Sequence, residues 1–286
     1  MPRSITRAGK GALGAIGSVR NFVHVLKEIR FDEIRESAEQ VPSLLVLAPL
    51  YTDAEAVAQV LAGENHRAQV ESARLDGNPR LVGGYDAVVI FSEDFVTTIS
   101  TAGANVAVVG FSGTDPRSLR AARETREAIL TRTPERAAAF GRHIPAFRAA
   151  AVEAIINETA RANAQFALVS NIPAMIPLVG SLASAGADFI VLTKNQMMMM
   201  YKIAAAHDQD LRDQIKVLRE LLPVVGAGLF WRTVARELAS FLPFAAGTIP
   251  KVAIAYTGTV VAGRAADFYY RAGRKPTREQ MRAYYR

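Results

Sequence analysis

Hydrophobic positions between residues 42 and 132 follow an alternating α/β pattern. Three short apolar runs, rich in branched side chains, predict buried strands at 43–50, 85–91 and 105–111. A segment with helical spacing ends in Gly63, and a second predicted helix opens with Asp115 as its N-cap and Pro116 at its first position. Continuous apolar strands separated by helices indicate a small, mainly parallel sheet that is covered on both faces.

From Pro134 onward the pattern is helical and much more apolar. No charged residue occurs between Arg161 and Asp188. Prolines within this run, and within a second apolar run at 238–263, favour bends between helices over straight lipid-facing spans. Lys251, inside the second run, would be costly against lipid. We therefore predict an all-α hydrophobic helical bundle, which is either packed densely in water or dips into a membrane.

The stretch 189–207 begins like the base-reading motif of GTPases and continues with four consecutive methionines. The fourth position of that motif is Gln196, although a carboxylate is needed there to accept hydrogen bonds from guanine. No glycine or proline occurs between Ala187 and Leu222. We predict one helix from Asp188 to about His207, in which Asp188, Asn195 and Lys202 form a polar stripe and the methionines fill the core rather than an adaptable binding surface.

The change in composition near Thr133–Pro134 divides the predicted chain. Residues 1–40 read as a basic amphipathic helical segment, which either lies on a membrane or packs on its own protein. Residues 41–132 form the predicted α/β domain, and residues 134–286 form the predicted helical domain with a basic, aromatic tail.

The net charge of +7 belongs to the two ends of the chain. Residues 1–20 carry four basic residues and no acidic one, and residues 264–286 carry seven basic residues against two acidic ones. Such ends attract anionic lipid or nucleic acid, and the apolar helices before the tail favour lipid or self-association over nucleic acid. The residues predicted to contact a membrane or partner are Arg3, Arg7, Lys10, Arg271, Arg274, Lys275, Arg278, Tyr284 and Tyr285.

Residues for catalysis or metal binding are sparse. The chain has no cysteine, and its four histidines are scattered without the spacing of a zinc site. The segment 110–114 approaches the nucleophile elbow of hydrolases, but Thr114 stands where the second glycine of that motif belongs. We interpret this segment as a turn between a strand and a helix, and we predict no catalytic residue, metal or cofactor.

Residues 134–286 resemble the helical, often membrane-associated domain of unknown function that follows the G domain in certain bacterial GTPases and their relatives. The resemblance covers about half of the chain. It rests on a series of short motifs, of which the last two are the more specific: IPLVG, Asp188, NQMMMMYKIA, LPFAAGTIPK, AYTGTVVAGRAADFYYRAG and REQMRAYY. It implies membrane association but no particular chemistry.

The same resemblance implies a G domain before the helices, and the residues that bind phosphate in such a domain are replaced. Aligned at the end of the first strand, Ala48 and Asp53 stand where a P-loop has its two glycines. Ala54 replaces the phosphate-binding lysine, and Glu55 replaces the magnesium-binding Ser or Thr. We predict a domain without a P-loop that binds no nucleotide, either a degenerate G domain or another small doubly wound domain.

These patterns together predict a non-enzymatic, membrane-associated accessory or scaffolding protein on the cytoplasmic side, with the α/β domain as an interaction module. One alternative is a soluble protein that self-assembles or binds a hydrophobic protein partner through its helices. A second alternative is an enzyme of an unrecognised type.

Overall fold

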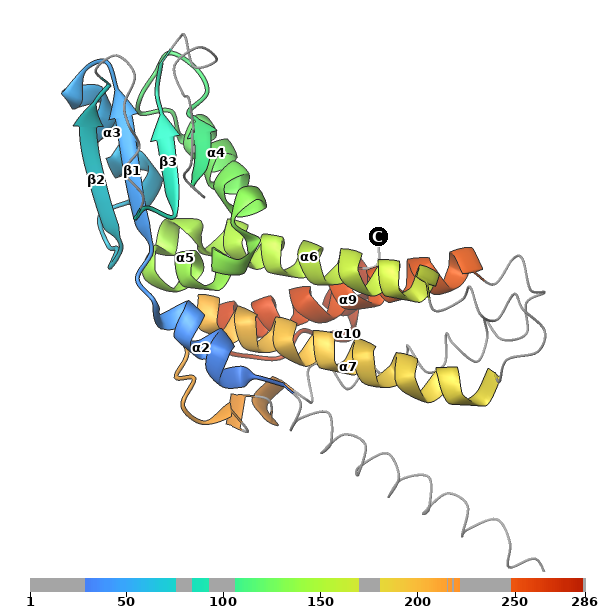
Figure 1. Cartoon of the computed structure of the whole chain (residues 1–286). Coiled ribbons are helices and arrows are strands. Elements are labelled where there is room, and N and C mark those ends of the chain that lie inside the picture. Colours follow the sequence, from blue (N-terminus) through green and yellow to red (C-terminus); the bar gives the residue numbers. More distant parts are fainter. Residues whose placement is uncertain are drawn as a thin grey trace, which may run out of the picture.

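The computed structural model describes residues 29–75, 84–92, 106–169, 181–214, 216–217, 219–221 and 248–284. A small sheet lies at one end, and long helices extend away from it (Figure 1). The first elements are α2 (Phe31–Glu39), β1 (Ser43–Ala48), α3 (Tyr51–Ala62), β2 (Gln69–Arg74), β3 (Ala87–Ile90), β4 (Ala107–Gly110) and α4 (Leu119–Arg132). The later elements are the 3-10 turns η1 (Pro134–Arg136) and η2 (Pro145–Phe147) and the helices α5 (Ala137–His143), α6 (Arg148–Val169), α7 (Ser181–Ala206), α9 (Thr248–Ala272) and α10 (Arg278–Ala283).

The sheet is parallel throughout and has the strand order β2-β1-β3-β4. The three strands predicted from apolar runs are confirmed as β1, β3 and β4, each shorter than its run. The sequence analysis missed β2, whose residues QVESAR are mostly polar and only partly buried. A strand at the edge of a sheet has one partner and one solvated side, so it does not need the continuous apolar run by which buried strands are recognised.

Side chains of alternate strand residues divide between two apolar clusters. Leu44, Val46 and Val89 belong to the main core with α3 and α4. Leu47, Val88, Ile90 and Val108 form a separate cluster on the opposite face. Within the described ranges no helix packs on that opposite face, so the prediction of helices on both faces is confirmed for one face only.

The sequence predicted the end of α3 correctly but not the start of α4. Helix α3 ends before Gly63, which has a φ of 72°, as the sequence predicted. The predicted N-cap of α4 is wrong: Ser118 caps the helix, and its hydroxyl accepts from the backbone N–H of Ala121. The side chain of Asp115 instead accepts from the backbone N–H of Arg117 and closes a turn before the helix.

Three long helices, α6, α7 and α9, pack against each other in the second part. Helix α7 is continuous through the TKNQ stretch, which confirms a helix there and not a base-reading loop. Met197, Met199 and Met200 are buried in the core, as predicted. Pro250, which the sequence analysis treated as an interruption, lies in the first turn of α9, where proline is compatible with a helix.

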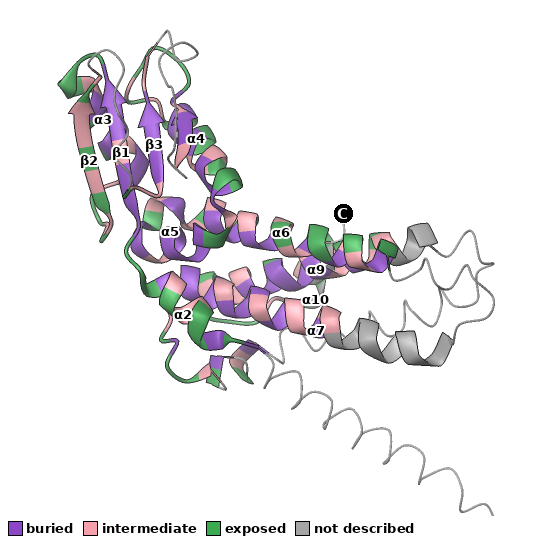
Figure 2. Cartoon of the chain, in the orientation of Figure 1, coloured by how far each residue is buried: buried purple, intermediate pink, exposed green. Residues whose placement is uncertain are grey.

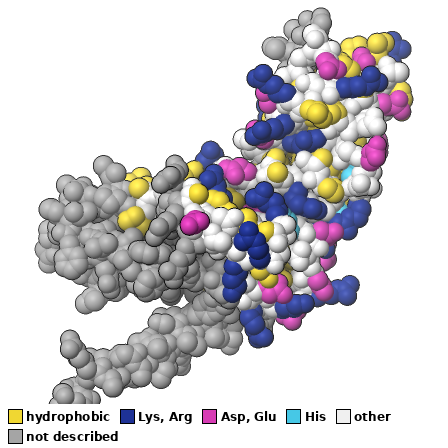
Figure 3. Space-filling model, turned by 180° about the vertical axis from the view of Figure 1, so that it is seen from behind, with side chains coloured by type: hydrophobic (Ala, Val, Ile, Leu, Met, Phe, Trp, Pro, Cys, Tyr) yellow, Lys and Arg dark blue, Asp and Glu magenta, His cyan; other side chains and the backbone are white. Residues whose placement is uncertain are grey.

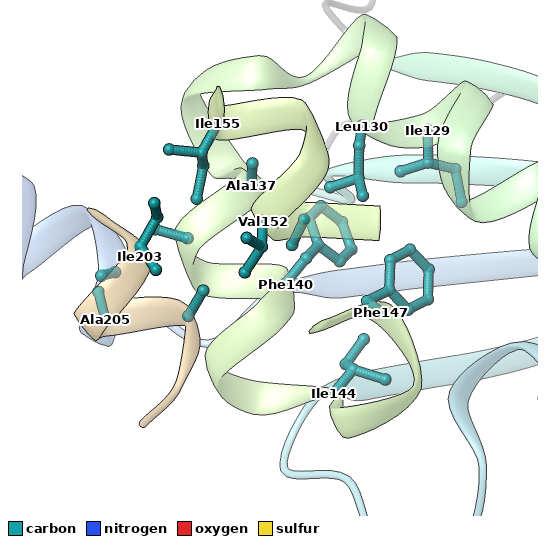
Figure 4. Packing of buried hydrophobic residues seen from close by; sticks show 14 of the residues in the cluster. Ile129, Leu130, Ala137, Phe140, Ile144, Phe147, Val152, Ile155, Ile203 and Ala205 are labelled. Carbon is teal, nitrogen blue, oxygen red and sulfur yellow. The ribbon is translucent and has the colours of Figure 1, made fainter. Parts of the chain in front are cut away.

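The main core continues without a break from the sheet into the helices. Phe140 and Phe147 stack with ring centroids 5.1 Å apart at the junction of the two parts. Ile129 of α4 lies on one side of them and Ile203 of α7 on the other (Figure 4). Buried residues likewise run from β1 and β3 through α5 into α6 (Figure 2). The division of the chain near Thr133–Pro134 stays a prediction.

Helices α6 and α9 approach each other most closely at Gly263. A Cβ atom at this position would lie 2.5 Å from Cγ1 of the buried Ile156, whereas a Cβ atom at Gly258 of the same helix would have no neighbour within 4 Å. We expect Gly263→Ala to lower the free energy of unfolding by about 1–2 kcal/mol, because overpacking outweighs the gain in helix propensity. Gly258→Ala should instead raise it by about 0.5–1 kcal/mol.

Urea denaturation of the two variants measures this difference. Pairing Gly263→Ala with Ile156→Ala should cost less than the sum of the two single losses, because Ile156→Ala removes the side-chain atoms that the new methyl group would meet. If both glycine variants were stabilised equally, α6 and α9 would not approach each other closely at this point.

Candidate functional site: helices α6, α7 and α9

Three uncharged polar side chains meet between the three long helices. Nδ2 of Asn163 in α6 donates to Oγ1 of Thr259 in α9 at 2.9 Å. Nδ2 of Asn195 in α7 donates to Oδ1 of Asn163 at 2.8 Å. Thr259 donates its own hydroxyl hydrogen to the carbonyl of Ala255 at 2.7 Å. Asn163, Asn195 and Thr259, which we call the polar centre, are therefore linked by hydrogen bonds. Asn163 and Thr259 are fully buried, and Asn195 is half-buried.

The polar centre defines the alignment of the helices. Each member comes from a different helix, so the hydrogen bonds form in one register only, and leaving a buried polar group unpaired is costly. Towards the sheet, Nζ of Lys202 lies 3.6 Å from Oε2 of Glu158, which continues the same α6–α7 register. The two members of the predicted polar stripe with described side chains, Asn195 and Lys202, thus both contact α6.

Sequence reasoning singled out Asn195 but missed the other two members of the polar centre. Asn163 is one of several uncharged polar residues in an alanine-rich segment, and Thr259 follows a glycine in an apolar run. The only sequence signal for the polar centre was weak, namely that each of the three most apolar segments contains a polar residue. Next to the polar centre, Gln196 is 3% exposed, and its Oε1 has no hydrogen-bond partner among the described residues.

A histidine–carboxylate pair joins the carboxyl ends of α7 and α9. Nε2 of His207 lies 2.9 Å from Oδ1 of Asp267, and Oδ2 of Asp267 lies 2.5 Å from the guanidinium of Arg271. The ring of His207 stacks on that of Tyr270 with centroids 5.4 Å apart. Burial, reinforced by the charge of Glu220, raises the pKa of the Tyr270 hydroxyl, so this phenol stays protonated at neutral pH.

A histidine–carboxylate pair can serve as a catalytic base towards a protein nucleophile, a bound water or a substrate. A carboxylate orients a histidine so that its other ring nitrogen takes a proton from a Ser, Thr or Cys side chain. In the part of the chain that the structure describes, no Ser or Thr hydroxyl is hydrogen-bonded to His207. The contact between His207 and Asp267 joins the end of α7 to the end of α9, at the point where the basic tail begins.

The predicted basic residues at the end of α9 are on the surface. Arg271, Arg274 and Lys275 are all exposed. Arg271 pairs with Asp267, and the guanidinium of Arg274 lies 5.1 Å from the ring centroid of Phe268. Tyr284 is half-buried. Four other predicted contact residues lie outside the described residues: Arg3, Arg7, Lys10 and Tyr285. The side chain of Arg278 also lies outside them, although its backbone is described.

Large apolar side chains are exposed at the carboxyl edge of the sheet. Leu50 and Tyr51 are 59% and 51% exposed where the chain leaves β1 and enters α3, and Leu119 is 76% exposed at the start of α4. In open parallel sheets, ligands bind at this edge beside the point where the winding reverses, which lies here between β1 and β3. Apolar side chains at this edge suit an apolar partner surface better than a phosphate group.

No family model, curated protein or solved structure was found to match this chain. Within the described ranges, no helix has the length and apolar character needed to cross a membrane. The same residues contain no group of three or more His, Asp or Glu side chains that could hold a metal ion.

Proposed function

We propose that this chain is a non-enzymatic accessory or scaffolding protein that attaches to an anionic membrane, on the cytoplasmic side, through its helical part. One observation carries the proposal: the end of α9 exposes Arg271, Arg274 and Lys275 together. Neither Arg274 nor Lys275 forms an ion pair with a carboxylate of the described residues. Exposed cations in such a cluster attract anionic headgroups, at about 1 kcal/mol for each residue near the surface.

The apolar helices supply the second contribution to the free energy of membrane binding, which is the burial of apolar side chains in lipid. In this proposal α6, α7 and α9 belong to a hydrophobic helical bundle, and apolar side chains on its surface enter the lipid after the tail has made the first contact. Half of all residues in the chain are hydrophobic, and its mean hydropathy is +0.12. Burial of apolar surface does not depend on salt, whereas attraction of the tail does.

The sheet part acts in this proposal as an interaction module that lacks a P-loop and binds no nucleotide. Pro49 and Leu50 alone separate β1 from α3, and the first turn of α3 carries the carboxylate of Asp53. A carboxylate at a helix N-terminus occupies the place where a phosphate would bind. The exposed Leu50 and Tyr51 support a protein partner at this edge.

Co-sedimentation with vesicles of phosphatidylcholine and phosphatidylserine tests the attachment. We expect the full-length protein to bind these vesicles more tightly than neutral ones. The variant Arg274→Gln/Lys275→Gln should bind about tenfold to thirtyfold more weakly at low salt, because it loses two headgroup contacts. The difference should shrink as salt is added.

The matched control is Arg120→Gln/Arg123→Gln on α4, which removes the same charge from two exposed residues of the sheet part. This control should bind nearly as well as the unaltered protein. If the unaltered protein stays in the supernatant even at low salt, the membrane proposal is wrong. Self-assembly or binding of a hydrophobic protein partner then takes its place, and light scattering of the free protein would show the former.

A further inference from the structure

Four basic side chains lie on the long helices at the level of the polar centre or nearer the sheet. Arg161 of α6 and Arg264 of α9 are exposed, and Lys194 and Lys202 of α7 are half-buried. The polar centre fixes the heights of these residues relative to one another. Arg161 lies two residues before Asn163, and Lys194 lies one residue before Asn195, whereas Arg264 and Lys202 lie further towards the sheet. At 1.5 Å per residue, the four span about 12 Å along the helix axes, from Lys194 to Lys202. We call these four residues the basic collar.

Beyond the basic collar the helices become apolar towards the end remote from the sheet, which we call the distal end. It comprises the last residues of α6 and the first residues of α7 and α9 (Figure 1). No charged residue occurs at 162–169 of α6 or at 252–263 of α9. Asp188 and Lys251 add one charge of each sign, and their side chains lie outside the described residues.

Apolar side chains of the distal end are exposed. Leu168 and Val169 are 53% and 61% exposed, and Tyr256 of α9 is also exposed. Seen from behind, a small group of hydrophobic side chains is visible towards this end, and the Lys and Arg side chains in view lie nearer the sheet (Figure 3). A cationic belt beside an apolar tip is the arrangement that a bilayer surface favours, with the belt among the headgroups and the tip in the acyl chains.

We propose that the long helices enter the membrane end-on, with the distal end in the lipid as far as the basic collar and the sheet pointing away from the bilayer. This inference rests on the proposed membrane attachment. From the level of the polar centre, α6 extends about 9 Å, α9 about 16 Å and α7 about 21 Å to their distal ends, at 1.5 Å per residue. These lengths suit one leaflet, whose apolar half is about 15 Å deep.

The interior of the helices suits this orientation. Within lipid, the hydrophobic effect no longer holds helices together, and hydrogen bonds between helices take over part of that role. The polar centre supplies such bonds among α6, α7 and α9 at the level of the basic collar. After Gly273 the chain turns back, so that in Figure 1 α10 lies level with the middle of the long helices. Arg271, Arg274 and Lys275 lie at the sheet end of α9, with Arg271 about 18 Å from the level of Thr259 at 1.5 Å per residue. In this orientation they make the first contact with the membrane, and the basic collar holds the inserted state.

Single fluorescent labels test the orientation, because the chain has no cysteine of its own. The full-length variants Leu168→Cys and Leu119→Cys place an environment-sensitive dye at the distal end and at the sheet, both at exposed positions. With vesicles of phosphatidylcholine and phosphatidylserine, the dye at residue 168 should shift its emission to the blue and lose intensity to nitroxides on the acyl chains. The dye at residue 119 should do neither.

A second variant, Arg161→Gln/Arg264→Gln, tests the basic collar. It should bind these vesicles about thirtyfold more weakly, the effect of two headgroup contacts of about 1 kcal/mol each, while Arg120→Gln/Arg123→Gln remains the control.

The outcomes separate the inference from the attachment on which it rests. If the protein sediments with vesicles but the dye at residue 168 stays in water, or the dye at residue 119 enters lipid, the end-on orientation is wrong and the attachment stands. If the protein does not sediment with vesicles at all, the attachment itself is wrong. A blue shift at residue 168 without vesicles, together with a doubled mass, would make the distal end an interface between two copies and would overturn both.

Discussion

Replacing Arg136 by Met is expected to lower the free energy of unfolding by about 2–4 kcal/mol, because it leaves the half-buried carboxylate of Asp86 without its counter-charge. Met keeps much of the length of the arginine stem, so the loss comes from charge and hydrogen bonds more than from packing. Urea denaturation followed by circular dichroism measures the change.

The guanidinium of Arg136 joins three elements at the amino edge of the sheet. Its Nε donates to Oδ1 of Asp86 at 2.7 Å, and Asp86 lies directly before β3. Its Nη1 donates to the carbonyl of Ser37 at 2.8 Å, and its Nη2 donates to that of Gln40 at 3.2 Å, both at the end of α2. Oδ2 of Asp86 accepts from the backbone N–H of Ser43 at the start of β1. One side chain from the beginning of the helical part thus holds α2 and two strands in place.

Two further variants test whether the loss comes from the ion pair between Arg136 and Asp86. Arg120→Met removes an exposed arginine that pairs with Glu124 four residues later, and it should change stability by less than about 0.5 kcal/mol. The double variant Arg136→Met/Asp86→Leu should be more stable than Arg136→Met alone, because it no longer buries an unpaired charge. A double variant that is less stable than the single one would show that the pair matters through packing instead.

Much of the fold could be predicted because its core elements have strong periodic patterns. The strands β1, β3 and β4 are buried and continuous in apolar residues, and α7 combines good helix formers with a long stretch free of glycine and proline. Edge strand β2 and the start of α4 depend on weaker local signals. At α4, both Asp115 and Ser118 are suitable caps, and the turn that Asp115 closes with Arg117 decides between them.

The candidate site could be predicted only in part. Clustered charge made the basic tail visible, since charge can be counted along a sequence without knowledge of the fold. The polar centre and the basic collar depend on how three helices are aligned. Asn163 and Thr259 are 96 residues apart in sequence, and no pattern within either segment indicates that they hydrogen-bond. Arg161 and Arg264 reach a common level for the same reason.

The second large loss of stability is expected for substitutions in the polar centre. We expect Asn163→Ala to lower the free energy of unfolding by about 2–4 kcal/mol, since it removes two hydrogen bonds, leaves the amide of Asn195 without its acceptor and opens a cavity in a filled core. Asn157→Ala is the matched control in the same helix, because Asn157 bonds only to the exposed Glu153 and its loss should cost less than about 0.5 kcal/mol.

The double variant Asn163→Ala/Asn195→Ala separates hydrogen bonding from packing at the polar centre. Its loss should be smaller than the sum of the two single losses, because removing Asn195 also removes the unpaired amide that Asn163→Ala leaves behind. Urea denaturation of the unaltered protein, the two single variants and the double variant gives the coupling energy, and Asn157→Ala is measured beside them as the control. Purely additive losses, or equal losses for Asn163→Ala and Asn157→Ala, would show that these hydrogen bonds do not hold α6, α7 and α9 in register.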